Sequence, residues 1–355
     1  MRPVTFGLIG LGYWGPNLLR VLTDLRGVEV RWICDVDTAP LERLALRYPA
    51  VRATSALDDV LLDDEVDAVV IATPVFTHFE LAERTLRAGK HTFVEKPLAP
   101  SVEKADALLE LAAAENRVLT CGHTFIYSPP VRAVKRLLDA QELGDVFFVS
   151  SSRVNLGLHQ RDVSVIWDLG PHDFSILLYW LEEMPRSVRA VGRDSIVPGV
   201  PDVAFVTLTY ASEVVANVEL SWLAPSKLRR TVVVGSRKMV VYDDGSGEPV
   251  RLFDHGVVYK DPETFGEYQL SYRSGDILSP HIETYEPLAA ELADFAGAVR
   301  SGTPMHDQAQ LARNVVRLTE AADSSLRQGG AEVRPRASGR FAPRVGTPRA
   351  LERLA

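Results

Sequence analysis

The sequence predicts an α/β protein in which an N-terminal Rossmann domain, a doubly wound parallel sheet, precedes a C-terminal α/β domain with a large, mostly antiparallel open sheet. Three observations lead to this prediction. Short apolar segments alternate with helical patterns over the first 120 residues, and serial strand patterns follow after about residue 123. The length, 355 residues, exceeds what one hydrophobic core usually organises. Continuously apolar strands between helices are typical of parallel sheets covered on both faces.

The first part of the chain has the strand–helix alternation that a doubly wound sheet requires. Strands are expected at Val4–Gly10, Val28–Cys34, Asp67–Ala72, His91–Val94 and Val118–Cys121. Helices are expected at Gly15–Leu25, Leu41–Arg47, Phe79–Ala88 and Val102–Glu115. Crossovers between parallel strands are right-handed, which places helices on both faces of the sheet. We expect a domain over residues 1–122.

The second part predicts an antiparallel sheet with few intervening helices. A helix (Pro130–Leu138), a strand (Val146–Val154) and a helix from about Asp168 to Leu181 come first. Strands joined by short turns are expected at Val188–Ile196, Val203–Tyr210, Val214–Trp222, Arg230–Val234 and Met239–Tyr242, and closing helices at Pro287–Arg300 and Ala309–Arg327. This domain would cover 123–330, and the six arginines and three prolines of 331–355 indicate a loosely ordered basic tail.

Composition narrows the class of protein. A net charge of −8, from 39 basic and 47 acidic residues, disfavours a nucleic-acid partner. Apolar runs are too short to cross a bilayer, and the N-terminus has no signal-peptide pattern. The two cysteines, Cys34 and Cys121, can build neither a disulfide framework nor a zinc site by themselves. We therefore expect a cytoplasmic protein without a structural metal or a membrane partner.

The segment Gly10-Leu11-Gly12-Tyr13-Trp14-Gly15 fits the G-x-G-x-x-G pattern, and it lies between a predicted strand and a predicted helix. In that context Gly10 permits a tight turn, Gly12 lets the backbone approach a pyrophosphate, and Gly15 lets helix and strand pack closely. The exposed N–H groups near Tyr13 and Trp14 would meet the phosphate charge. A plain turn is the alternative.

Asp35 stands 20 residues after Gly15, at the end of the second strand. A carboxylate there accepts hydrogen bonds from the ribose hydroxyls and repels a 2′-phosphate. The residues that follow, Val36-Asp37-Thr38, offer no arginine. The sequence therefore predicts NAD as the cofactor, in preference to NADP.

Two later strands end in Ala72-Thr73-Pro74 and Glu95-Lys96-Pro97. Residues beyond the carboxyl ends of parallel strands line the ligand crevice, so Thr73, Pro74, Glu95 and Lys96 are expected beside the cofactor. Lys96 would stabilise a developing alkoxide, or else form a salt bridge. His78 would either bind the cofactor or cap the following helix.

The segment Asp168-Leu169-Gly170-Pro171-His172 places an acid and an imidazole four residues apart. On one helix they would share a face, where the acid raises the basicity of the histidine for proton abstraction. The alternative is that Asp168 is only an N-cap, with Pro171 at the third helical position, and that His172 is only a packed side chain.

The chain resembles the glucose–fructose oxidoreductase, inositol dehydrogenase and rhizopine-catabolism family of NAD(P)-dependent sugar oxidoreductases. The resemblance covers roughly residues 4–330 and rests on four stretches in the family's order: Gly7–Gly15, Ala72–His78, Glu95–Pro97 and Asp168–Asp173. It implies that Lys96 is the active-site lysine, His172 the proton-transferring histidine and Asp168 the acid beside it. One stretch departs from the pattern, since Asp162–Trp167 replaces the glycine-rich approach that many members have.

Within that family, the Gly-Tyr-Trp-Gly turn and the segment Arg153–Gly157 are most similar to members that oxidise or reduce the 3-position of nucleotide sugars and amino sugars, in polysaccharide or antibiotic pathways. An aminoglycoside dehydrogenase and an inositol dehydrogenase are related possibilities. The resemblance also implies a homodimer or homotetramer formed through the C-terminal sheet. Candidate substrate contacts, besides His172, are Tyr127, Arg153, Asn155, Trp167 and His281.

Two rival interpretations stay open. The same residues could reduce a nucleotide-activated keto sugar with NAD(P)H. From another class, a non-catalytic NAD-sensing regulator would use the Rossmann fold without needing Lys96, Asp168 and His172.

Overall fold

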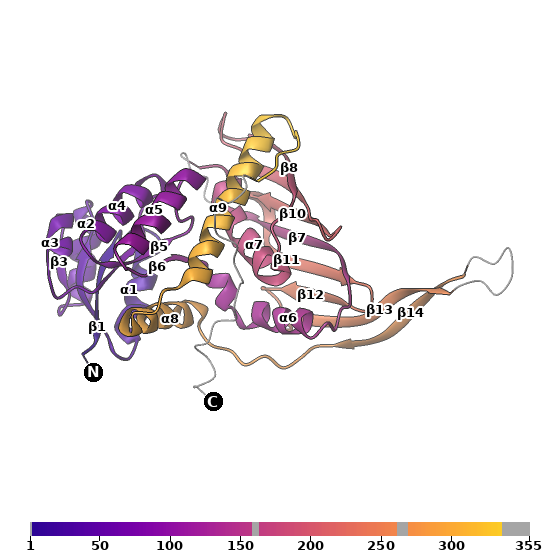
Figure 1. Cartoon of the computed structure of the whole chain (residues 1–355), viewed down its shortest axis with the longest axis horizontal. Coiled ribbons are helices and arrows are strands. Elements are labelled where there is room, and N and C mark those ends of the chain that lie inside the picture. The colour runs from indigo at the N-terminus through magenta and orange to yellow at the C-terminus, as the bar shows by residue number, and fades with distance from the viewer. Residues whose placement is uncertain (1, 158–162, 261–268, 336–355) are drawn as a thin grey trace. The chain divides into compact units, whose positions relative to one another are not determined.

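The computed structural model describes residues 2–157, 163–260 and 269–335, which divide into two compact units. The first unit contains residues 2–127 and 285–317, and the second contains the described residues of 128–284 and 318–335. Figure 1 labels most of the helices and strands of both units. Each unit is built on one sheet.

The first unit is a Rossmann fold, as the sequence predicts. Its six strands are parallel and follow the order β3-β2-β1-β4-β5-β6. The strands are β1 (Val4–Ile9), β2 (Val28–Cys34), β3 (Arg52–Thr54), β4 (Ala68–Ile71), β5 (His91–Glu95) and β6 (Leu119–Gly122). The helices are α1 (Gly15–Asp24), α2 (Thr38–Arg47), α3 (Leu57–Leu61), α4 (Val75–Arg87), α5 (Val102–Ala114) and the short 3₁₀ helix η1 (Thr124–Tyr127). The strand order reverses at β1 and β4, where doubly wound sheets bind their ligands.

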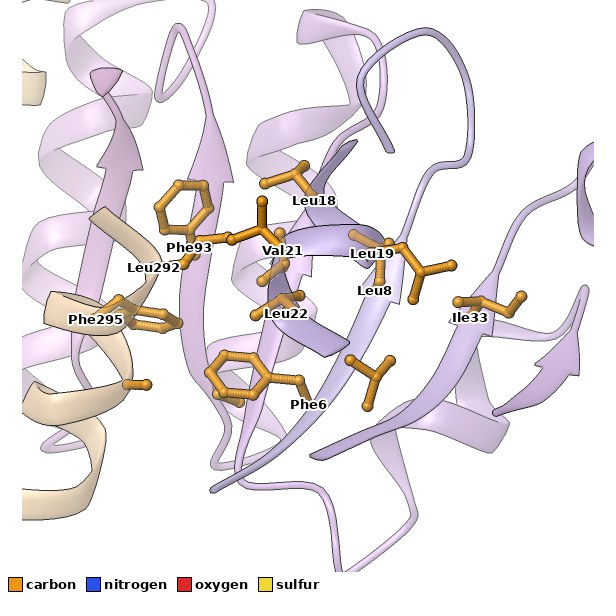
Figure 2. Packing of buried hydrophobic residues seen from close by; sticks show 14 of the residues in the cluster. Phe6, Leu8, Leu18, Leu19, Val21, Leu22, Ile33, Phe93, Leu292 and Phe295 are labelled. Atoms are coloured by element: carbon orange, nitrogen blue, oxygen red, sulfur yellow. The ribbon is translucent and has the colours of Figure 1, made fainter. Parts of the chain in front are cut away.

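A helix from far along the chain completes the core of this unit. The ring of Phe295, in α8 (Pro287–Ser301), lies 5.9 Å from that of Phe6 and 5.7 Å from that of Phe93, centroid to centroid. Figure 2 shows Phe295 and Leu292 of this helix among the buried side chains around β1 and α1. Burial of this apolar face groups residues 285–317 with the first unit, so the two units differ from the predicted domains 1–122 and 123–330.

The second unit holds an eight-stranded sheet in the order β14-β13-β12-β11-β7-β10-β9-β8. The strands are β7 (Val146–Leu156), β8 (Ser187–Arg193), β9 (Val203–Thr209), β10 (Val215–Ser221), β11 (Leu223–Gly235), β12 (Met239–Asp243), β13 (Val250–Lys260) and β14 (Gln269–Leu278). Only the β7–β10 pair among these is parallel. The helices α6 (Pro129–Asp139) and α7 (Val165–Leu181) pack on the sheet, and α9 (His306–Arg327) follows α8. The prediction of a mostly antiparallel sheet is confirmed, although β13 and β14 were not predicted.

The start of the predicted tail is attached to this sheet. The Val188 N–H donates to the Val333 carbonyl at 2.8 Å, and the reverse bond is 2.9 Å. The prediction of a loose tail from residue 331 is therefore wrong for 331–335, because this backbone pairs with the β8 edge. The remainder, 336–355, lies outside the described residues. Within the described part of the chain, no helix combines the length and apolarity needed to span a bilayer.

Candidate active site

The glycine-rich turn between β1 and α1 is tightly packed at its two ends and open in its middle. Gly10 has φ +93°, and a Cβ there would lie 2.5 Å from the Ala72 carbonyl oxygen. A Cβ on Gly15 would lie 2.2 Å from the Gly10 carbonyl oxygen. At Gly12, in contrast, a Cβ would meet nothing within 4 Å. The two outer glycines are thus needed for packing, whereas the middle one borders open space at the start of a helix, where an anion is stabilised.

Asp35 lies beside this turn. Its Oδ2 accepts a hydrogen bond from the Leu11 N–H at 2.6 Å, and its Oδ1 accepts one from the Asp37 N–H at 2.9 Å. These bonds hold the carboxylate at the end of β2, next to the backbone that would hold the phosphates. The arrangement fits the ribose contact that the sequence predicts.

Thr73 and Pro74 follow β4, and His78 lies one turn into α4. The His78 imidazole is buried; its Nδ1 lies 2.7 Å from the Pro97 carbonyl oxygen and its Nε2 lies 2.8 Å from the Thr73 carbonyl oxygen. Burial lowers the pKa of this imidazole. His78 thus links the loops after β4 and β5. It does not cap α4, because a cap accepts a hydrogen bond from a backbone N–H, whereas both partners of His78 are carbonyl oxygens. A contact between His78 and the cofactor stays a prediction.

Glu95 is the last residue of β5, and Lys96 follows it at the same sheet edge as Thr73. The Glu95 carboxylate accepts hydrogen bonds from the Lys96 N–H at 3.2 Å and from the Trp14 side chain. Burial raises the pKa of the Glu95 carboxyl to about 7, although the positive charge of Lys96 opposes this shift. A Cβ on Gly122 would lie 3.0 Å from both carboxylate oxygens, so the neighbouring strand leaves room for this group.

The helix that carries Asp168 and His172 begins earlier than predicted. α7 starts at Val165 after Ser164, so Asp168 lies in its first turn and Pro171 lies inside it. The N-cap interpretation of Asp168 is therefore wrong, because the apolar residues Val165 and Ile166, both buried, extend the helix upstream. The spacing of four places Asp168 and His172 on one helical face. Asp168 Oδ2 accepts a hydrogen bond from the Trp222 indole at 3.1 Å.

His172 lines an open pocket within the second unit. The lining residues come from three elements: Leu169 and His172 from α7; Arg153, Val154 and Asn155 from β7; Lys227 and Arg229 from β11. Three sequence-predicted residues, His172, Arg153 and Asn155, are thus brought together. Lys227 and Arg229 were missed, because β11 was predicted to begin only at Arg230; their spacing of two within a strand is the signal that could have found them.

Arg153, which lines this pocket, forms a buried ion pair with Asp173. The Arg153 Nε donates to Asp173 Oδ2, and the Ser151 hydroxyl donates to Asp173 Oδ1 at 2.7 Å. Asp173 follows His172 directly in α7, so the pair fixes the helix against β7 at the level of the imidazole.

The other predicted substrate contacts are not among the lining residues of this pocket. The Tyr127 side chain is buried in the first unit, where its hydroxyl donates to Asp294 at 2.7 Å. The Trp167 side chain hydrogen-bonds to Asp323 of α9. His281 is exposed in the segment after β14. Neither Trp167 nor His281 lines the pocket at His172. Lys96 and His172 belong to different units, so the convergence of Lys96 with His172 stays a prediction.

Two protein-family models match the chain. Residues 4–123 match the oxidoreductase family with an NAD-binding Rossmann fold, and residues 131–241 match the C-terminal domain of the Gfo/Idh/MocA proteins. Among curated proteins, the chain is 34% identical over 234 residues to a UDP-N-acetylglucosamine 3-dehydrogenase from Acidithiobacillus ferrooxidans, covering 63% of this chain and 69% of that protein. It is 31% identical over 193 residues to an inositol 2-dehydrogenase from Rhizobium meliloti, covering 53% and 58%.

The curated matches are partial. An uncharacterised oxidoreductase from Streptococcus pneumoniae is 27% identical, and the matched region spans 62% of its length. Solved structures match over nearly the whole chain. GenD2 from gentamicin A biosynthesis, solved with NAD, has a TM-score of 0.80 at 27% identity and covers 95% of this chain and 97% of its own. Together with the Rossmann turn and the two-sheet architecture, these matches show that the chain belongs to the Gfo/Idh/MocA oxidoreductase family with an NAD-binding Rossmann fold.

Proposed function

We propose that this protein is an NAD-dependent dehydrogenase that transfers a hydride between the 3-hydroxyl carbon of a sugar or amino sugar and the nicotinamide. The observation that carries the proposal is the position of His172, which lines an open pocket beside Asn155 and Arg153. An imidazole in such a pocket suits proton abstraction near neutral pH. In an oxidoreductase family, that proton comes from the alcohol that is oxidised.

The first unit fits the dinucleotide at two points. The open space at Gly12 would admit a pyrophosphate to the start of α1, and Asp35, held beside this turn by the Leu11 N–H, would accept hydrogen bonds from ribose hydroxyls. The negative charge of Asp35 repels a 2′-phosphate, which supports NAD over NADP. When bound, NAD supplies the hydride acceptor.

The chain's own side chains supply geometry and proton transfer. His172 would take the hydroxyl proton at an imidazole nitrogen, and Asp168, on the same face of α7, would orient the ring. Lys96 would hold the substrate oxygen through its ammonium group and stabilise negative charge that develops there. In the reverse direction the same groups would reduce a keto sugar, with His172 returning the proton.

Similarity supports a sugar as the substrate. One relative oxidises the 3-position of UDP-N-acetylglucosamine by name, and GenD2 belongs to a gentamicin pathway. These two relatives favour a role in polysaccharide or antibiotic biosynthesis. Because GenD2 belongs to a gentamicin pathway, an aminoglycoside is the alternative to a nucleotide sugar as the substrate. The inositol dehydrogenases among the relatives make a cyclic polyol a further candidate.

The open face of the second sheet favours a homodimer or homotetramer. Phe148 of β7, Phe205 of β9 and Val215 of β10 are exposed although they lie within strands. Apolar side chains on a sheet face are typical of an interface between subunits. Light scattering with Phe148→Ser would test this part of the proposal, since we expect the variant to give smaller particles.

The direct test is to measure the rate of NAD⁺ reduction with free sugars, inositols, nucleotide sugars and aminoglycosides as substrates. With the best substrate at saturation, His172→Ala and Lys96→Ala should each lower kcat about 10²-fold or more, while both variants still bind NAD. His306→Ala, at an exposed histidine, is the matched control. Near-normal turnover in both variants would refute the residue assignment. Tight NAD binding without turnover of any substrate would favour the NAD-sensing regulator instead.

A further inference from the structure

We propose that the pocket at His172 binds an anionic group of the substrate, so that the physiological substrate is a sugar carrying a phosphate or a carboxylate. This inference rests on the proposed function and narrows its substrate class. Among the residues that the structure describes, the lining includes three cationic side chains, Arg153, Lys227 and Arg229, and no acidic one.

The register of the sheet concentrates this positive charge. Arg229 of β11 lies directly opposite Arg153 of the antiparallel strand β7. Lys227 precedes Arg229 by two residues, and all three side chains line the same pocket. Three cationic groups are therefore gathered on one side of this pocket, where they would attract an anion.

The acids that pair with the two arginines do not line the pocket. Asp173 bonds to Arg153, and Asp244 Oδ2 accepts a hydrogen bond from Arg229 Nη1 at 2.9 Å. Both acids are absent from the pocket lining. Each therefore fixes one part of a guanidinium group while the arginine still contributes to the pocket wall. A guanidinium keeps its positive charge within such a pair, so both arginines still contribute cationic groups to the lining.

Lys227 is the most accessible of the three cations. Its side chain is exposed, and it forms no ion pair with any residue in the part of the chain that the structure describes. An ammonium group at the edge of a pocket attracts anions and is easily reached by them. Lys227 is therefore the residue whose removal should report on ligand charge with little effect on the fold.

The chemistry of these groups selects the ligand class. Guanidinium groups bind phosphate and carboxylate through paired N–H donors, and lysine adds a point charge. A phosphate ester, a nucleotide diphosphate sugar and a uronic acid share this anionic feature. A polyamino sugar would bring like charges to the pocket, which costs binding energy. The lining thus favours the anionic sugar over the aminoglycoside alternative.

The test compares matched substrates on matched variants. UDP-N-acetylglucosamine and N-acetylglucosamine have the same sugar ring but differ in charge. Glucuronic acid and glucose form a second such pair. An aminoglycoside is added as the cationic substrate. With wild-type enzyme we expect kcat/KM for at least one anionic member to exceed that of its neutral partner about tenfold or more, as a charge-assisted hydrogen bond provides. A preference for UDP-N-acetylglucosamine would indicate that the pocket binds a phosphate, and a preference for glucuronic acid would indicate that it binds a carboxylate.

Lys227→Gln should remove most of that preference, and Arg229→Gln should reduce it. Arg230→Gln is the control, because Arg230 is the neighbouring exposed cation on the same strand, it does not line the pocket, and the charge change is identical. The control should keep the preference. Turnover of neutral sugars as efficiently as anionic ones, or an unchanged preference in Lys227→Gln, would overturn the inference and leave the dehydrogenase proposal intact.

Binding without turnover separates the two proposals. If no sugar reduces NAD⁺, titration calorimetry with UDP-N-acetylglucosamine and glucuronic acid still measures the pocket. We expect Lys227→Gln to weaken binding of the anionic probe about tenfold relative to Arg230→Gln. Equal affinity in the two variants, or stronger binding of the aminoglycoside than of both anionic probes, would contradict the anionic pocket.

Discussion

The Trp14 indole donates a hydrogen bond to the Glu95 carboxylate, which ties the glycine-rich turn after β1 to the end of β5. The Lys96 N–H donates to the same carboxylate at 3.2 Å. One acid therefore supports both the turn proposed to hold the dinucleotide and the residue proposed to hold the substrate oxygen. Two motifs that are distant in the sequence share this single point of attachment.

The burial of the Glu95 carboxyl makes the stability of the protein depend on pH, and the hydrogen bonds from Trp14 and Lys96 reduce this effect. The pKa of Glu95 rises from an ordinary 4.5 to about 7 on folding. Because the folded-state value is the higher one, the contribution of the protonated group is fully present below pH 4.5 and is lost as the pH rises through 7. We expect Glu95→Gln to lessen the fall in unfolding free energy over this range by about 2 kcal/mol, measured by urea denaturation at several pH values.

Glu80→Gln is the control for this experiment, since Glu80 is exposed on α4. It should leave the pH profile unchanged. Some pH dependence should persist in Glu95→Gln, because burial also raises the pKa of Glu291. A profile that is identical in wild type and Glu95→Gln would show that Glu95 is solvated in the native state.

The elements that local patterns determine could be predicted from the sequence. The strand Val28–Cys34 was predicted with its observed bounds, and α1 was predicted to within one residue at its end. Gly10, Gly12 and Gly15 were recognised because strand, turn and helix signals adjoin in the sequence. At the level of the fold class, both sheets were predicted correctly.

Features that depend on distant contacts could not be predicted. β13 and β14 pair mainly with each other and carry exposed residues such as Val257 and Tyr272, so they lack the apolar alternation of a half-buried strand. Assignment of α8 to the first unit depends on the contacts of Phe295 with Phe6 and Phe93. The cationic pocket likewise depends on the register between β7 and β11, which no local pattern in either strand specifies.

Substitutions in the glycine turn should separate folding from cofactor binding. Gly12→Ala places its Cβ in open space, so the apo protein should unfold at the wild-type temperature. NAD binding should weaken about tenfold or more, because the methyl group would occupy the approach of the pyrophosphate. Thermal unfolding and cofactor titration measure the two effects.

Gly15→Ala serves as the counterpart. Its Cβ would lie 2.2 Å from a backbone oxygen, which cannot move without displacing the turn. We expect a loss of about 2 kcal/mol in unfolding free energy. Equal stability of Gly12→Ala and Gly15→Ala would contradict the observed packing of helix and strand.

Asp35 should determine the choice between NAD and NADP. Asp35→Ala removes the ribose acceptor and the charge that repels a 2′-phosphate, so the ratio of NADP to NAD affinity should rise about tenfold. Asp37→Ser is the control, because it removes a neighbouring charge yet keeps an N-cap acceptor for α2. If wild type already binds NADP more tightly than NAD, the role assigned to Asp35 is wrong.

The buried ion pair of Arg153 and Asp173 should be costly to break. The side chains of Arg153 and Asp173 are 5% and 3% exposed, so Asp173→Asn removes a negative charge that lies directly against a buried guanidinium. We expect a loss of about 3–5 kcal/mol in unfolding free energy, and a smaller loss in the double variant Arg153→Met/Asp173→Asn, because neither charge then remains buried. The surface pair of Arg189 and Glu332, 61% and 43% exposed, supplies the control, and Glu332→Gln should cost no more than about 1 kcal/mol. Comparable losses in Asp173→Asn and Glu332→Gln, measured by urea denaturation, would show that water reaches the Arg153 guanidinium and compensates its charge.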